Sequence, residues 1–242
     1  MNPFSNRLQA GQLLAEQLEE YAGRQDVAVL ALPRSGVPVG YAIAARLECP
    51  LDILLVGKLG VPGHEDMAMG AVSSRGVCVL RPETIALLDI PPDVIETMAQ
   101  RELREMKHRE SAYRAIRPQH DLKDRVVIVA DDGLVSGATM LAAVRTLRHE
   151  HPAKIIVAVP VATPDSIAEL RAEVETVICL QVPEWFASVA QWYEDASPVE
   201  DAQVMKYLRE AAQWRLPEEA GAQASHHGAS SSRNNAPAAR PS

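Results

Sequence analysis

Residues 126–140 read Val-Val-Ile-Val-Ala-Asp-Asp-Gly-Leu-Val-Ser-Gly-Ala-Thr-Met and continue into an Ala-, Leu- and Arg-rich run that ends near Glu150. The apolar, largely β-branched start is bounded by charged residues, which predicts a buried parallel strand. The run after Gly137 predicts a helix. The two adjacent acids and the small residues that follow them therefore lie where a strand leads into a helix.

The predicted helix start is suited to an anion. The N-terminus of a helix carries unpaired backbone N–H groups and a partial positive charge, and both favour a phosphate group. Gly133 and Gly137 let the backbone come close to such a ligand, while the hydroxyls of Ser136 and Thr139 add donors. The loop is thus a candidate phosphate site.

The two acids that precede this loop point to a sugar. Asp131 and Asp132 only accept hydrogen bonds when ionised, so they suit a ligand with vicinal hydroxyls. The loop is not a Walker P-loop, because no Lys precedes Ser136, and it is not a Gly-x-Gly-x-x-Gly dinucleotide turn. We expect a sugar phosphate as the ligand; the alternative is an ordinary helix cap after a strand.

The order of these residues resembles the signature with which type I phosphoribosyltransferases bind phosphoribosyl diphosphate (PRPP): a hydrophobic strand, two acids, three variable residues and Ser/Thr-Gly-x-Thr. The resemblance covers roughly residues 4–210. Pro-Arg-Ser-Gly at 33–36, Lys-Leu-Gly-Val-Pro-Gly at 58–63 and Glu-Asp-Met-Ala-Met-Gly-Ala at 65–71 make it greatest to a bacterial branch of phosphoribosyltransferase-domain proteins with no assigned base. It implies an α/β fold: a doubly wound, mainly parallel sheet flanked by helices, with a small C-terminal hood at about residues 182–216.

A second loop repeats the same pattern. The run 27–32 predicts a buried strand, and Pro33-Arg34-Ser35-Gly36 separates it from a predicted helix over 37–47. Loops that follow parallel strands meet at one edge of the sheet, where ligands bind. The resemblance implies that this loop, often with a strained or cis peptide bond in the family, holds the diphosphate through Arg34, Ser35 and Gly36. The alternative is an ordinary turn with a solvated Arg.

A third region that could contact the ligand follows the predicted strand 51–56. Gly and Pro punctuate residues 57–70, which predicts a mobile loop. In the family a flexible loop between early strands closes over PRPP and shields the reacting carbon from water. The resemblance places Lys58 against the diphosphate, whereas His64 and Glu65 could reach the leaving group or the base, or simply be exposed.

The other predicted helices and strands complete one domain over residues 1–216. We expect residues 217–242, rich in Ala, Ser, Pro and Asn without periodicity, to form a disordered tail. Hydrophobic periodicity predicts helices over 7–21, 92–115, 164–171 and 199–214, a core strand over 154–160 and another over 174–180, and short strands over 72–80 around a turn at 73–76.

The hood segment concentrates aromatic residues between 183 and 195. In the family, this segment recognises the acceptor, commonly by stacking an aromatic ring on a base. The resemblance therefore implies that Trp185 or Phe186 binds the acceptor. The alternative is a lid that only covers the core.

Composition narrows the functional classes. The net charge of −8 argues against non-specific nucleic-acid binding, which depends on Lys and Arg. Cys49, Cys78 and Cys179 are far apart and odd in number, which predicts small buried side chains in a reducing compartment. Residues 1–12 are too polar for a signal peptide, and no apolar run reaches membrane-spanning length. We expect a cytoplasmic protein without nucleic-acid or membrane partners.

The resemblance implies a transferase. A nitrogen nucleophile would displace the diphosphate of PRPP, with Asp131, Asp132 and Lys58 as the catalytic set and residues 136–139, including Ala138, on the 5′-phosphate. Mg²⁺ would arrive bound to PRPP and need no direct protein ligand, although Asp132 could reach it through water. A homodimer is compatible with this expectation.

One departure from the family constrains the acceptor. Hypoxanthine–guanine enzymes place an Asp three positions after the second acid, where this chain has Val135. A 6-oxopurine acceptor of that type is therefore disfavoured, while adenine-like, pyrimidine and non-nucleobase acceptors stay open. Two other functions also stay open: a regulatory protein that senses PRPP or nucleotides without catalysis, and a sugar-phosphate-binding protein without chemistry.

Overall fold

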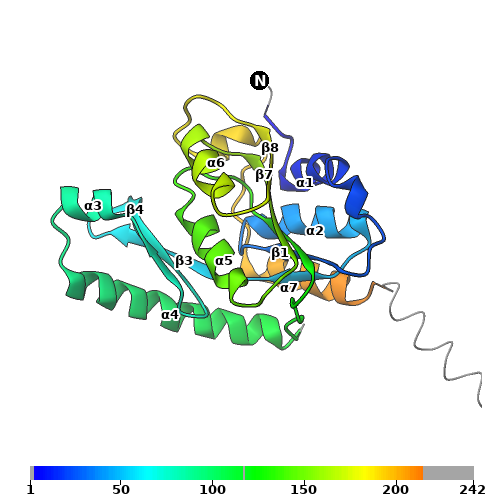
Figure 1. The fold of residues 1–242 in the computed structure, drawn as a ribbon, viewed down its shortest axis with the longest axis horizontal. Coiled ribbons are helices and arrows are strands. Elements are labelled where there is room, and N and C mark those ends of the chain that lie inside the picture. Colours follow the sequence, from blue (N-terminus) through cyan, green and yellow to red (C-terminus); the bar gives the residue numbers. More distant parts are fainter. Residues whose placement is uncertain (1–2, 117, 215–242) are drawn as a thin grey trace, which may run out of the picture.

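The computed structural model describes residues 3–116 and 118–214. Five parallel strands form the central sheet (Figure 1). The strand order places the first strand of the chain beside the strand Val126–Ala130, so the loops after these two strands share one edge of the sheet. Along the sheet the strands are β2 (Leu51–Ile53), β1 (Val27–Ala31), β6 (Val126–Ala130), β7 (Lys154–Val161) and β8 (Thr176–Gln181).

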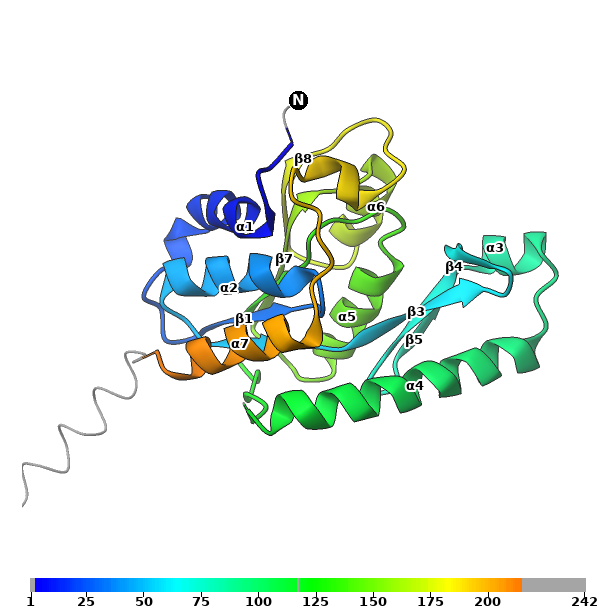
Figure 2. The ribbon, with the colours of Figure 1, turned by 180° about the vertical axis from the view of Figure 1, so that it is seen from behind.

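Helices cover both faces of this sheet, as Figures 1 and 2 show from opposite sides. Side chains of β6 alternate between the two cores: Ile128 packs on one face, Val127 and Val129 on the other. The predicted doubly wound α/β architecture is confirmed. On the Ile128 face lie α1 (Arg7–Glu16), α2 (Gly36–Leu47) and α7 (Asp201–Ala212), and on the other face lie α5 (Ala138–Arg148) and α6 (Pro164–Arg171).

A second, antiparallel sheet extends to one side of the core, together with two helices (Figure 2). We call residues 56–114 the arm. Its base is tied to the core, since Arg114 forms an ion pair of 2.5 Å with the buried Asp52 and the Tyr113 hydroxyl donates to Asp201. The arm comprises β3 (Val56–Val61), β4 (His64–Ser73), β5 (Cys78–Leu80), α3 (Pro82–Leu87) and α4 (Pro92–Arg114).

The arm corrects the prediction of a mobile loop over residues 57–70. These residues form a β-hairpin in which Val61 pairs with His64, and Gly63 takes a φ of 78° in the turn. Gly70 serves strand packing, since a Cβ there would lie 2.4 Å from the Val79 carbonyl oxygen. Glycines that mark a loop in the sequence thus also allow close backbone contact within a sheet.

The structure confirms one smaller prediction from the sequence and corrects two others. The turn within residues 73–76 is confirmed, with Gly76 donating to the Ser73 carbonyl. The first helix ends at Glu16, and a separate 3₁₀ helix follows over Glu19–Tyr21, so the prediction of one helix to residue 21 was wrong. Cys78 is exposed, against the expected burial, because β5 turns it outward at the sheet edge. The predicted tail over residues 217–242 lies outside the described residues.

None of the helices within residues 3–116 and 118–214 has both the length and the apolar character needed to cross a membrane.

Candidate functional site

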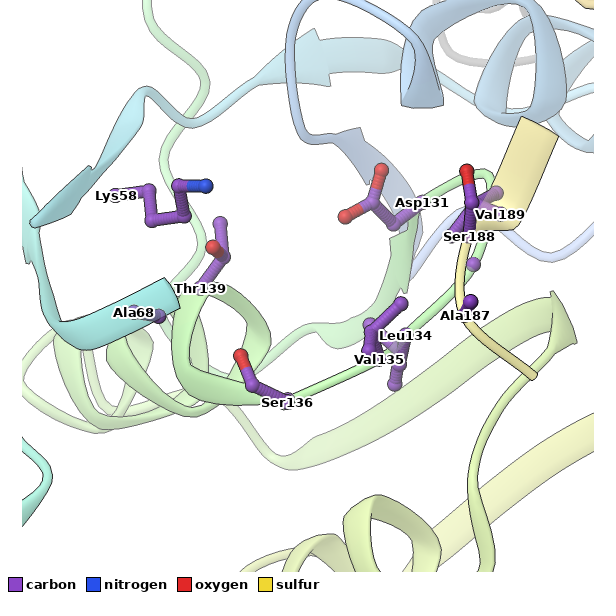
Figure 3. A pocket seen from close by; sticks show the side chains of 12 residues that line it. Lys58, Ala68, Asp131, Leu134, Val135, Ser136, Thr139, Ala187, Ser188 and Val189 are labelled. Carbon is purple, nitrogen blue, oxygen red and sulfur yellow. The ribbon is translucent and has the colours of Figure 1, made fainter. Parts of the chain in front are cut away.

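A cavity of about 580 Å³ opens at the carboxyl end of β6 (Figure 3). Three parts of the chain enclose it: the loop between β6 and α5, the first two strands of the arm, and the segment after β8. The lining residues are Asp131, Gly133, Leu134, Val135, Ser136, Gly137 and Thr139 from the loop, Lys58 and Ala68 from the arm, and Ala187, Ser188 and Val189 from the segment after β8.

The β6–α5 loop is held in a shape that presents its backbone to the cavity. Leu134 bridges to the end of β7, donating to the Val161 carbonyl at 2.9 Å and accepting from Thr163 at 3.1 Å. Gly137 has a φ of 68° and precedes the first residue of α5, with no side chain capping the helix. Amides of the first helical turn therefore lie beside the cavity, as an anion site requires.

Asp131 faces this cavity. Figure 3 shows its carboxylate and the Lys58 ammonium pointing toward one another across the open space. Burial, and then the charge of Asp132, raise the pKa of Asp131 well above its ordinary value. A carboxylate so poorly solvated gains much from a ligand that supplies hydroxyl donors or a cation.

Asp132 has a different environment from its neighbour. Its side chain is 10 % exposed and pairs with Arg7, whose Nε lies 2.9 Å from Oδ2. Arg7 also donates to the Ser197 carbonyl at 3.0 Å and lies over the Tyr193 ring, while the Tyr193 hydroxyl donates to the Asp132 carbonyl at 2.6 Å. The predicted ribose contact of Asp132 stays a prediction; the structure shows it as the anchor of the loop to α1 and the hood.

Arg7 and Tyr193 were not among the site residues predicted from the sequence. Arg7 is 125 residues from its acidic partner and lies at the start of α1, and no local motif marks either residue. The available signal was indirect, since two adjacent acids at a buried strand end require at least one cationic partner.

The loop between β1 and α2 packs against Asp131. A Cβ at Gly36 would lie 2.9 Å from the Asp131 Oδ1, so only glycine permits this approach of the two loops. The Pro33–Arg34 peptide bond is cis. Arg34 is exposed and lies 3.8 Å from the Glu200 carboxylate, a contact that two solvated side chains exchange readily for another anion. Arg34, Ser35 and Gly36 do not line the cavity itself.

The two aromatic residues proposed for the acceptor lie outside the cavity lining. Trp185 is 78 % exposed, whereas Phe186 is buried and packs edge-on against Trp192 with ring centroids 6.1 Å apart. The next three residues, 187–189, form the cavity wall instead. The acceptor role of Trp185 and Phe186 stays a prediction, and the hood meets the cavity through small side chains.

The donor set beside the cavity suits a magnesium ion that arrives with its ligand. Within the described residues, no three His, Cys, Asp or Glu side chains cluster as metal ligands. Asp131 is the acidic residue in the cavity lining. Mg²⁺ commonly keeps several waters and binds through one or two carboxylates plus substrate phosphates, so one carboxylate beside a phosphate site fits it.

Comparison with known proteins agrees with this geometry. A family model for the phosphoribosyl transferase domain matches residues 5–197. Relatives in two strains of Mycobacterium tuberculosis, provisionally named phosphoribosyl transferases, are 34 % identical over 211 residues. That alignment covers 87 % of this chain and 47 % of each relative, so the chain spans about half the length of the curated relatives it matches.

A solved structure is similar over nearly its whole length. The protein TT1426 from Thermus thermophilus is 40 % identical, with a TM-score of 0.72, and the match covers 88 % of this chain and 99 % of that one. The family match spans both loops of the site, the arm and the hood segment that lines the cavity. The chain therefore belongs to the phosphoribosyltransferase family.

Proposed function

We propose that this protein transfers the phosphoribosyl group of PRPP to a nitrogen acceptor and releases diphosphate. One observation carries the proposal: the loop over residues 131–139, which we call the phosphate loop, surrounds one cavity at the carboxyl end of parallel strands together with the half-buried Asp131 carboxylate and a lysine. These are the groups that a ribose bearing phosphates at both ends requires.

Each part of PRPP has a counterpart in the site. The amides and hydroxyls of residues 136–139 bind the 5′-phosphate, and Asp131 accepts hydrogen bonds from the ribose hydroxyls. Lys58 and the loop at Arg34 hold the diphosphate. Asp132 keeps Asp131 and the phosphate loop in place through its ion pair with Arg7.

Catalysis then rests on positioning and charge stabilisation. The anomeric C–O bond breaks as the C–N bond forms, and the sugar carries positive charge in the transition state. Lys58 stabilises the negative charge that grows on the departing diphosphate, and the adjacent Asp131 carboxylate favours the cationic sugar. Asp131 would be the side chain nearest a Mg²⁺ ion bound with PRPP, and such an ion would supply further charge neutralisation at the diphosphate.

The acceptor is constrained at one position. Val135 is 43 % exposed and lines the cavity, so an apolar side chain stands where hypoxanthine–guanine enzymes handle a purine proton with Asp. This supports an acceptor other than a 6-oxopurine. Adenine-like, pyrimidine and non-nucleobase nitrogen compounds remain candidates.

The test is a screen of nucleobases and small amines with PRPP and Mg²⁺ in which diphosphate release is followed. Each acceptor is compared with a reaction without acceptor and with one containing a chelator. Acceptor-dependent release supports the proposal. PRPP binding by calorimetry without any acceptor-dependent release would instead favour a sensing role.

We expect Lys58→Met to raise the KM for PRPP roughly tenfold or more, because it removes a charged partner of the diphosphate. Binding of ribose 5-phosphate, which has no diphosphate, should change little. Lys206→Met is the matched control, since Lys206 is exposed on α7 and does not line the cavity. Equal losses for both ligands would contradict this assignment of Lys58.

We also expect a pH dependence that originates in Asp131. Its pKa is raised in the folded protein, so between the ordinary and the raised value the folded state binds more protons than the unfolded state. The free energy of unfolding of the ligand-free protein should therefore fall as pH rises through this window. Urea titrations of wild type and Asp131→Asn across pH measure it; an unchanged difference between the two proteins would contradict it.

A further inference from the structure

Three successive carbonyl groups of the phosphate loop accept hydrogen bonds from donors that do not line the cavity. The Val135 carbonyl accepts from the hydroxyls of Thr163 and Ser166, each at 2.9 Å. The Ser136 carbonyl accepts from the guanidinium of Arg81, and the Gly137 carbonyl accepts from Leu141 within α5. The donors come from α6, from the arm and from α5.

The direction of these carbonyls determines where the amides point. In a trans peptide the C=O and the following N–H point in opposite directions. Binding the Val135 and Ser136 carbonyls from behind therefore turns the N–H groups of Ser136 and Gly137 toward the cavity. Among the described residues these two amides have no acceptor. They are oriented before any ligand arrives, which lowers the cost of binding one.

Arg81 is itself held in one geometry. Its two terminal nitrogens lie 2.9 and 2.7 Å from the two carboxylate oxygens of Glu169 on α6. Its side chain is 21 % exposed, and its backbone amide donates to the Met69 carbonyl of β4 at 2.8 Å. A bidentate Arg–carboxylate pair fixes the plane of the guanidinium, so the remaining N–H can be aimed at one carbonyl.

We propose that Arg81 is a positioning residue for phosphate binding: held by Glu169, it anchors the Ser136 carbonyl so that the Gly137 amide faces the 5′-phosphate. This inference rests on the proposed function of the cavity. Arg81 begins the link from β5 to α3, so it also joins the arm, which carries Lys58, to the phosphate loop. One side chain thereby keeps the two ends of the PRPP site at a fixed separation.

Calorimetry with ribose 5-phosphate and with PRPP plus Mg²⁺ tests the proposal. Arg81→Met should weaken ribose 5-phosphate binding roughly tenfold and PRPP binding at least as much, as expected for losing one charge-assisted contact. Lys58→Met should affect PRPP alone. Arg145→Met is the matched control, because Arg145 pairs with Glu173 on the same side of the protein, outside the cavity lining, and its loss should leave both affinities unchanged.

Two further variants separate positioning from general stability. Arg81→Lys keeps the charge but cannot contact both Glu169 and the carbonyl as a fork, so most of the loss should remain. Glu169→Gln combined with Arg81→Met should be no worse than Arg81→Met alone, because the two residues act through one contact.

The measured affinities decide whether Arg81 positions the phosphate loop. Wild-type affinity in Arg81→Met, full recovery in Arg81→Lys, or additive losses in the double variant would overturn the positioning role while leaving the proposed function standing. A wild-type protein that binds neither ligand would overturn both. Weakened binding in Arg81→Met with the melting temperature of the Arg145→Met control supports the proposal.

Discussion

Replacing Asp131 with Asn is expected to weaken PRPP binding by roughly 100-fold while the protein stays folded. The carboxylate faces the cavity and would accept hydrogen bonds from two ribose hydroxyls, and hydrogen bonds to charged groups contribute about 1.5–3 kcal/mol each. The melting temperature should be unchanged or higher, because burial and the charge of Asp132 already disfavour the ionised Asp131. Calorimetry and thermal unfolding on one preparation measure both quantities.

Asp132→Asn is the comparison variant: its larger effect should be on stability, and any loss of PRPP affinity should be secondary to the loosened loop. Asp132 forms the buried pair with Arg7, so its neutral variant removes the carboxylate that pairs directly with this cation. The cost is roughly 3 kcal/mol, the low end for breaking such a pair, because the Asn amide oxygen can still accept from Arg7. For a chain of this size that lowers the melting temperature by about 6–12 °C. If Asp131→Asn leaves PRPP affinity unchanged, the ribose assignment fails, and most of the case for the proposed function fails with it.

The contrast between the two acids shows what a sequence motif can and cannot predict. The motif places both at the end of β6, and the structure confirms that placement. Successive residues after a strand point to opposite sides, so the two side chains are expected to differ. The motif does not reveal which of them faces the cavity and which faces α1. The partner that distinguishes them, Arg7, is 125 residues away.

The central sheet was predictable because its strands are buried on both faces. Every residue of β1 and β6 is buried, so each strand is a continuous apolar run that ends at a loop of small residues. The arm was not predictable in the same way. Gly57, for example, lies against Glu102 of α4, and a Cβ there would be 2.7 Å from that carboxylate. Local composition shows the glycine but not the distant helix that requires it.

The phosphate loop was predictable from the sequence only in part. Its glycines and hydroxyls were identified from local sequence, and five of the predicted loop residues line the cavity: Asp131, Gly133, Ser136, Gly137 and Thr139. The groups that orient its backbone come from α6 and the arm, and neither Arg81 nor Ser166 belongs to a local motif. Long-range contacts of this kind require the three-dimensional structure.

Gly137→Val should abolish PRPP binding more completely than Ser136→Ala. Gly137 has a φ of 68°, which a β-branched residue adopts only with strain, and its position at the helix start aims the amides at the cavity. An added Cβ would lie 3.1 Å from the Ser166 hydroxyl, the group that holds the Val135 carbonyl. Valine would therefore distort the turn and displace one of its anchors together.

Ser136→Ala removes one exposed hydroxyl and leaves the backbone unchanged. A hydrogen bond contributes about 0.5–1.5 kcal/mol net, and somewhat more to a charged partner, so binding should weaken by roughly tenfold. Gly137→Ala provides the intermediate case, since it adds the Cβ without the branch. Calorimetry with PRPP, with circular dichroism to verify folding, should rank the losses Val, then Ala at 137, then Ala at 136. If folded Ser136→Ala loses as much affinity as Gly137→Val, side chains hold the phosphate, and the backbone account of this loop is wrong.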